Sequence, residues 1–163
     1  MAQAGPPRTR RSVLGAVSGL TTIALVGCLG DRTATYETGE IPDVDAESRT
    51  PEELAAAEAV AETDVREGVS PLADLAIVDH EFVLEDGYEG ATVQGTVTND
   101  RDDRIELVEV RVRVFDADGS QLGRYVARTG DLDGGTDWSF TVVLLEDPAE
   151  LERYEIAVLG APS

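Results

Sequence analysis

The alternation of apolar and charged residues between positions 108 and 114 places the strongest constraint on how this chain can fold. Valine occupies every second position of this run, and Glu109, Arg111 and Arg113 stand between the valines. A period of two puts the two sets on opposite faces of a β-strand, whereas a helix would distribute the valines around its axis. We therefore predict a strand with a buried face of valines and a polar outer face.

Five further stretches show a similar alternation and are separated by turn signals. They cover residues 75–85, 91–98, 121–129, 138–144 and 154–158. Turns such as Asp-Ala-Asp-Gly at 116–119 supply a glycine for a positive φ. Six to seven short strands over residues 72–160 predict a mainly β chain with a single antiparallel β-sandwich of immunoglobulin-like type.

Some details of the predicted core can be stated residue by residue. We expect Val78, Phe82 and Leu84 to share the inward face of the first of these strands. We expect Trp138, the only tryptophan, to cap the core at the start of a later strand. The alternative is a surface tryptophan that anchors a binding partner.

The charge of the chain excludes one class of partner. There are 33 acidic residues against 13 basic ones, and every basic residue is arginine. A formal net charge of −20 rules against nucleic acid, because phosphate binding requires a basic face. The acids are dispersed rather than gathered in a tail. This lysine-free, dispersed acidity resembles the composition of proteins from extreme halophiles, where molar salt screens the repulsion. The alternative is an acidic secreted protein from an organism with an arginine-rich, high-GC genome.

Residues 1–27 are typical of a secretory signal. Arg10 and Arg11 lie in the run Thr-Arg-Arg-Ser-Val-Leu, which resembles the twin-arginine export motif. An uncharged stretch follows at 13–26. As a helix it would span about 21 Å, less than the ~30 Å of a bilayer core, so a signal is favoured over a permanent membrane span.

The end of this stretch predicts a lipid anchor. Leu25, Val26 and Gly27 precede Cys28, the only cysteine, and the run resembles a lipobox. The resemblance implies cleavage after Gly27 and a lipid on Cys28, whereas the alternative is a buried core cysteine. A diacyl or diether group would hold the protein at the cell surface, on the outer face of the cytoplasmic membrane.

Residues 28–71 predict an acidic, solvated linker, because large apolar residues are few and charge is high. Within it, Thr50, Pro51 and Glu53 form the signature of a helix N-terminus, and a short helix over 51–66 is expected. Its apolar stripe is too sparse for firm docking. The predicted role of the segment is a spacer.

Three blocks of the sandwich segment resemble the FxLYD domain, a small extracytoplasmic β-sandwich module found in lipoproteins. Residues 93–99, 110–119 and 132–140 carry these blocks in order and at family-like spacing. The name-giving segment falls on 112–116, where Val, Val and Phe replace Phe, Leu and Tyr, and Asp116 is kept. The resemblance implies a lipoprotein sandwich and offers no catalytic residues to carry over.

No catalytic or metal site is predicted. His80, the only histidine, is expected to be a hydrogen-bonded or edge residue, because zinc would need further ligands. A Ser-His-Asp relay would have to use Ser70, Ser120 or Ser139, and none lies in a nucleophile elbow. A calcium-binding site remains an open alternative at three oxygen-rich loops, which cover residues 99–103, 116–119 and 131–134.

These features predict a lipid-anchored cell-surface protein whose β-sandwich is a non-enzymatic interaction module. No cofactor is expected, and the partner is an unknown protein or envelope component besides the membrane itself. The alternative function is a calcium- or ion-responsive adhesion domain, whose acidic loops would become ordered when calcium is added.

Overall fold

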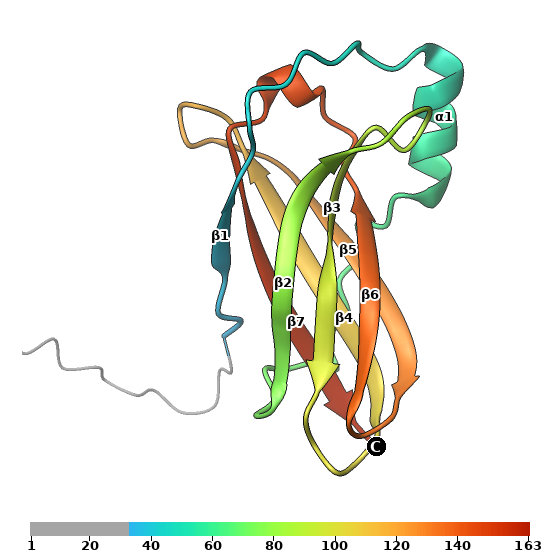
Figure 1. The fold of residues 1–163 in the computed structure, drawn as a ribbon, viewed down its shortest axis with the longest axis vertical. Coiled ribbons are helices and arrows are strands. Elements are labelled where there is room, and N and C mark those ends of the chain that lie inside the picture. Colours follow the sequence, from blue (N-terminus) through green and yellow to red (C-terminus); the bar gives the residue numbers. More distant parts are fainter. Residues whose placement is uncertain (1–32) are drawn as a thin grey trace, which may run out of the picture. The chain divides into compact units, whose positions relative to one another are not determined.

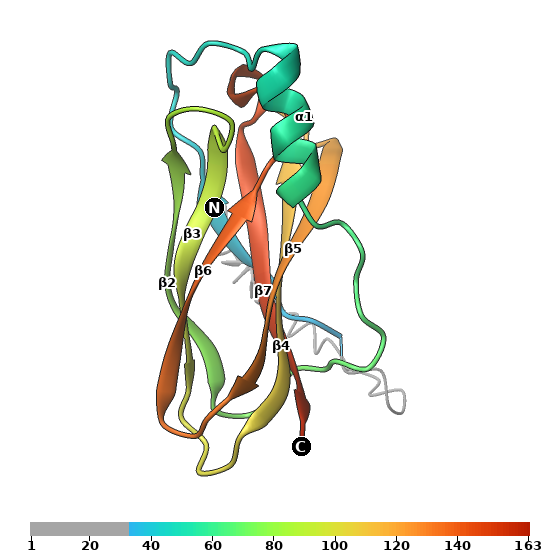
Figure 2. The same cartoon turned by 90° about the vertical axis from the view of Figure 1, so that its right-hand side faces the viewer.

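Seven antiparallel strands form two sheets that pack face to face (Figures 1 and 2). The computed structural model describes residues 33–163. The strands are β1 (Glu37–Glu40), β2 (Leu75–Leu84), β3 (Ala91–Asn99), β4 (Ile105–Phe115), β5 (Gln121–Leu132), β6 (Thr136–Val143) and β7 (Arg153–Pro162). The helical elements are α1 (Pro51–Val60) and the short 3-10 helix η1 (Pro148–Glu150).

The strand order confirms the prediction of a mainly β chain with one antiparallel sandwich. Sheet A has the order β1-β7-β4-β5, and sheet B has the order β2-β3-β6. In Figure 1 the upper end of the sandwich carries α1 and the loops 85–90 and 116–120. The lower end carries the loop 100–104 and the C-terminus.

The predicted alternation in β4 is confirmed and builds the centre of the core. The four valines of residues 108–114 are fully buried between the sheets. β4 is paired on both sides, with β5 and with β7, and therefore lies in the interior of sheet A. Its inward face packs against the strands of sheet B. Val93 and Val97 of β3 are equally buried opposite them. Burying such aliphatic side chains stabilises a fold by about 1.5–3 kcal/mol each.

The expected inward face of β2 is wrong at Val78. The register with β3 shifts between Ile77 and Asp79, which marks a β-bulge. A bulge inserts one extra residue and inverts the alternation that follows from the sequence. Val78 is therefore 57% exposed and Ile77 packs against the core in its place. Phe82 is partly buried as expected, and Leu84 is 39% exposed.

The described part of the predicted spacer is not a solvated linker but folds onto the sandwich. β1 pairs with β7, and Ile41 enters the hydrophobic core. Further along, Glu62 forms an isolated bridge with Val126 of β5, and Ser70 forms one with Gly160 of β7. We call residues 61–71 the strap. The prediction of a solvated linker is wrong because backbone hydrogen bonds to sheet edges require no apolar sequence.

Helix α1 begins where it was predicted and ends earlier. Thr50 Oγ1 accepts from the Glu53 amide at 3.3 Å, and Glu53 Oε2 accepts from the Thr50 amide at 2.9 Å. The predicted helix 51–66 is six residues too long, because the strap turns into its bridge with β5 directly after α1. Ala57 is fully buried, so α1 docks on the sandwich.

Candidate functional site

The residues predicted to direct export and lipidation lie outside the described residues. They are Arg10, Arg11, Leu25, Val26, Gly27 and Cys28. Within residues 33–163, no helix is long and apolar enough to cross a membrane.

His80 joins the two sheets at the seam between β2 and β7. Its Nδ1 lies 2.7 Å from the Tyr154 hydroxyl, and its Nε2 lies 3.5 Å from Glu37 Oε2 of β1. Burial, with a smaller contribution from the charge of Glu81, raises the pKa of Tyr154 to about 12, so this hydroxyl is neutral at pH 7. The prediction of a hydrogen-bonded histidine is confirmed.

The serines that a relay would need do not meet His80. Ser70 is bound to Gly160 through its backbone, and the Ser120 amide donates to Asp116 Oδ1 at 2.8 Å. Ser139 lies on β6, with its side chain on the outer face of sheet B. Both ring nitrogens of His80 are instead directed at Tyr154 and Glu37. This geometry provides no Ser-His pair.

The oxygen-rich loops use their polar atoms to hold themselves together. Asn99 Nδ2 donates to three carbonyls, those of Asp103 at 3.0 Å, Leu132 at 3.0 Å and Asp133 at 3.1 Å. Asn99 thus ties the β3–β4 loop to the β5–β6 turn. Nowhere in residues 33–163 do three His, Cys, Asp or Glu side chains converge as a metal ligand set.

Glu109 is a buried charge that the sequence analysis did not single out. It lies on the outer face of sheet A, is fully buried, and is covered by the strap. Its Oε1 lies 2.6 Å from Arg111 Nε, and its Oε2 lies 2.8 Å from Arg128 Nε. The Arg66 amide of the strap donates to Oε2 at 3.1 Å. Alternation placed Glu109 on the polar face, but nothing local signals that a distant segment covers it.

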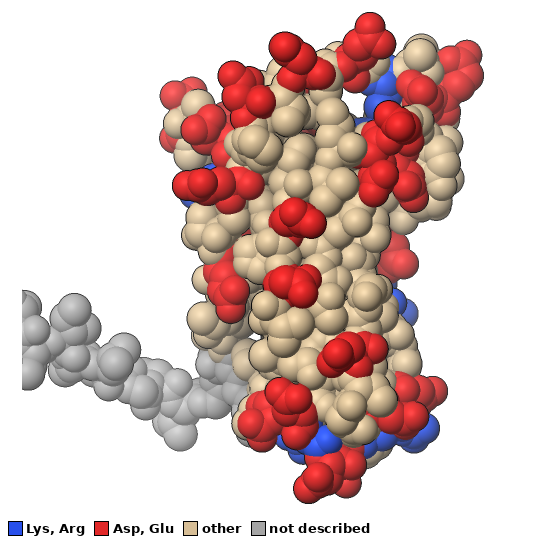
Figure 3. Space-filling model, in the orientation of Figure 1, with Lys and Arg blue, Asp and Glu red and all other residues tan. Residues whose placement is uncertain are grey.

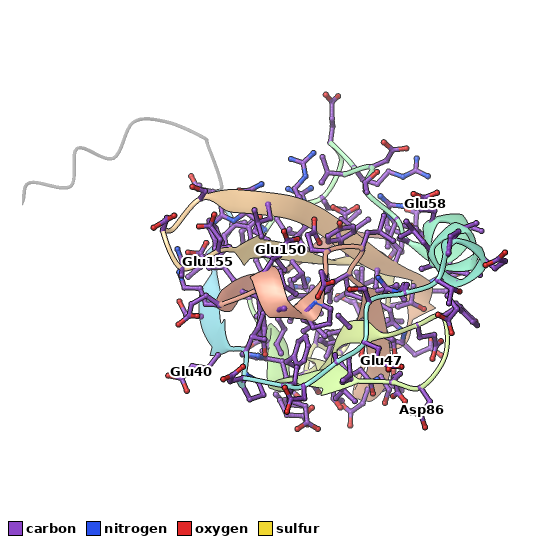
Figure 4. All side chains as sticks on the ribbon, turned by 90° about the horizontal axis from the view of Figure 1, so that it is seen from above. Glu40, Glu47, Glu58, Asp86, Glu150 and Glu155 are labelled. Carbon is purple, nitrogen blue, oxygen red and sulfur yellow. The ribbon has the colours of Figure 1, made fainter. Side chains whose placement is uncertain are left out.

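Arg49 fastens the chain at the upper end of the sandwich. Its guanidinium donates to four carbonyls, two on the β2–β3 loop and two that follow β6: Tyr88 at 2.8 Å, Glu89 at 2.5 Å, Leu144 at 2.8 Å and Leu145 at 3.3 Å. The same residue lines a hollow of about 370 Å³ whose other charged residues are acidic. Figure 4 looks down on this end, where Glu40, Glu58 and Asp86 lie at the periphery.

The seam between β5 and β6 holds a second hollow of about 200 Å³. We call it the β5–β6 groove. Val126 and Arg128 of β5 line it on one side, and Trp138 and Ser139 of β6 line it on the other. Helix α1 stands at the upper end of the seam, where Val60 reaches the groove (Figure 2).

Trp138 is partly buried at the edge of the core. It packs against the core cluster, and its ring centroid lies 5.9 Å from that of Phe140. The expectation of a ring that caps the core is confirmed. The same ring lines the β5–β6 groove, so its outer part remains available at the surface.

Comparisons with known proteins relate the chain to one archaeal protein. No family model matches the sequence, and no solved structure gives a match. A curated relative, an uncharacterized protein of Methanocaldococcus jannaschii, is 30% identical over 84 residues. The match covers 50% of this chain and 62% of the relative, so the chain spans less than two thirds of the relative's length. The relative brings no activity with it.

Proposed function

We propose that this chain is a cell-surface protein, held on the outer face of the cytoplasmic membrane by a lipid on Cys28, whose sandwich is a non-enzymatic interaction module. One observation carries the proposal: the chain already lies on the sandwich at Thr35, seven residues after the lipobox cysteine, where Thr35 shares a hollow with Leu72 and Leu75. β1 then pairs with β7 from Glu37 onward. A lipid at Cys28 would therefore hold the folded domain directly at the membrane.

The export route in this proposal is the twin-arginine pathway. Arg10 and Arg11 precede an uncharged segment that ends in Leu25, Val26 and Gly27. In an acidic chain whose carboxylates repel each other, molar salt favours the folded state. A domain that folds in the saline cytoplasm suits a pathway that carries folded chains.

The interaction module in this proposal offers a flat, polar and weakly charged surface. The accessible part of the outer face of sheet B carries hydroxyl and amide side chains, contributed by Gln94, Thr96, Ser139 and Thr141. Figure 3 shows carboxylates crowding the upper and lower ends, with only isolated acids in between. This surface supports an unknown protein or envelope partner, and no cofactor is proposed.

The anchor is tested by changing Cys28. Cys28→Ser should release the protein from the membrane fraction or leave an uncleaved precursor, because the thiol is the lipid acceptor. Gly27→Ala is the matched control, since it keeps a small residue before the cysteine and should preserve lipidation. Mass spectrometry of the N-terminal peptide identifies the lipid. Membrane-bound Cys28→Ser protein of mature size and normal amount would contradict the proposal.

A further inference from the structure

Three of the four sheet edges are protected by the chain itself. In sheet A, the edge strand β1 has only four residues and begins and ends with glutamate. The other edge of sheet A, β5, is bridged by Glu62 at Val126. In sheet B, β2 carries the bulge at Val78 and the exposed acids Asp79 and Glu81. Short length, charge, bulges and covering segments all prevent edge pairing.

The fourth edge, β6, has no bulge and is covered only in part, where Val60 and Glu62 stand across the β5–β6 groove. It runs for eight residues, contains no proline or bulge, and pairs only with β3 among the described strands. Its sequence, Thr-Asp-Trp-Ser-Phe-Thr-Val-Val, is rich in aromatic and β-branched residues and carries a single charge. In sheets with an exposed edge of this kind, another strand can add.

The free hydrogen-bonding groups of β6 can be assigned to particular residues. The Leu144 amide donates to the Ala91 carbonyl at 2.9 Å, directly beyond the last register pair of β6 with β3. Hydrogen-bonded and non-hydrogen-bonded residues alternate in an antiparallel ladder. The backbone N–H and C=O groups of the even-numbered residues of β6 therefore point toward β3. The amides of Asp137, Ser139, Thr141 and Val143 therefore point away from β3, toward the β5–β6 groove.

The groove determines what can occupy this edge. Val60, Glu62 and Arg128 form the wall opposite Ser139 and Thr141. The hollow of about 200 Å³ has room for a short stretch of one extended chain beside β6. Arg128 Nη2 is buried beside the groove and has no acceptor among the described residues.

We propose that β6 binds an extended segment of a partner polypeptide, which pairs with its outward amides in the β5–β6 groove and offers a carbonyl or carboxylate to Arg128. The proposal rests on the proposed function only in taking the sandwich as an interaction module, and it does not depend on the lipid. Main-chain hydrogen bonds supply most of the affinity in this mode, so the partner's sequence matters mainly near Arg128 and Trp138.

The test uses full-length protein in detergent at molar salt and a synthetic octapeptide of alternating threonine and valine with a C-terminal glutamate. Amide hydrogen exchange should slow at Asp137, Ser139, Thr141 and Val143 when the peptide is added. A peptide with proline at alternate positions is the control and should leave exchange unchanged. Absence of slowing at about 1 mM peptide, or slowing at other sites only, overturns the proposal.

A variant pair at one position separates backbone pairing from side-chain contact. Ser139→Pro removes an outward amide and should weaken peptide binding by about tenfold, whereas Ser139→Ala keeps the amide and should bind like the wild type. Equal affinities of the two variants would refute pairing along β6. If Ser139→Pro does not fold, the slowing of amide exchange along β6 in the wild type decides whether the peptide pairs with this strand. A wild-type dimer that protects the same amides without peptide would assign β6 to a second copy and overturn the proposed occupant.

Discussion

Glu109 shows how a single carboxylate can fasten a segment that the sequence presents as a linker. A fully buried ion is costly unless its partners satisfy it, and here two arginines and one backbone amide do so. Arg111 and Arg128 also bind the strap directly: Arg111 Nη2 donates to the Arg66 carbonyl at 2.8 Å, and Arg128 Nη1 lies 2.5 Å from Glu62 Oε2. The cluster therefore couples β4 and β5 to the strap.

Neutralising this carboxylate should therefore destabilise the domain. Glu109→Gln leaves the partly buried Arg111 without its counter-charge and Arg128 with Glu62 alone, and we expect a loss of about 3 kcal/mol in the free energy of unfolding. Glu155→Gln is the control, because Glu155 pairs with Arg113 and Arg153 at a more exposed position and should cost less than about 1 kcal/mol. Urea unfolding at fixed molar salt measures both. Equal losses in the two variants would show that burial under the strap adds nothing.

Single residues also show what a sequence can predict. Alternation correctly placed the valines of β4 inward, because that pattern depends only on the local backbone. It could not foresee that Glu109 is covered, because the strap lies more than 35 residues earlier in the sequence. The prediction that Val78 points inward failed for a different reason, since a bulge changes the period without a proline or glycine to mark it.

Among the elements, those that bury apolar residues were predicted and those that pair at edges were missed. The expected strands correspond to β2 through β7 with small differences at their ends. β1 has the sequence Glu-Thr-Gly-Glu, which contains no apolar residue and resembles a loop. Its position is decided by the free edge of β7 and by the ring of Tyr154, against which Gly39 packs. Such information is tertiary and is absent from any local pattern.

The attachment of β1 depends on the missing side chain of Gly39. A Cβ at this position would stand 2.0 Å from Tyr154 Cζ, so Gly39→Ala should push β1 away from β7 and cost about 1–3 kcal/mol. Gly68→Ala is the control, because nothing lies within 4 Å of its Cβ position. Faster amide exchange in residues 37–40 of Gly39→Ala, together with a lower Tm, is expected. Unchanged exchange at β1 would contradict the assigned packing.

Over the whole molecule, the excess of acids makes stability depend on salt. The net charge is −20, and the carboxylates crowd the two ends of the sandwich (Figure 3). At 1 M salt the Debye length is about 3 Å, which removes most of the repulsion between exposed carboxylates. The Tm should therefore rise steadily between about 0.1 and 3 M salt. A Tm that is independent of salt over this range would show that the exposed acids do not oppose folding.

The docking of residues 33–71 also changes where the domain would sit on a membrane. A free linker over residues 28–71 would hold the sandwich at an r.m.s. distance of about 35 Å. Because Thr35 already lies on the sandwich, the seven residues from Cys28 to Thr35 span at most about 25 Å. Thr35 lies beside Leu72 and Leu75, so the chain enters the sandwich on the side of its lower half. The lower end should therefore face the bilayer.

This orientation can be measured with single cysteines, because the native Cys28 would be blocked by its lipid. A dye on Asp102→Cys in the lower β3–β4 loop should transfer energy to labelled lipids more efficiently than a dye on Asp118→Cys in the upper β4–β5 turn. The 11 residues of β4 separate the two ends by about 36 Å, which makes the difference resolvable. A flexible Gly/Ser insert of about 40 residues after position 30 is the control, since it restores a free tether and should equalise the two signals. Equal transfer without the insert would mean that residues 33–71 do not hold the sandwich at the membrane.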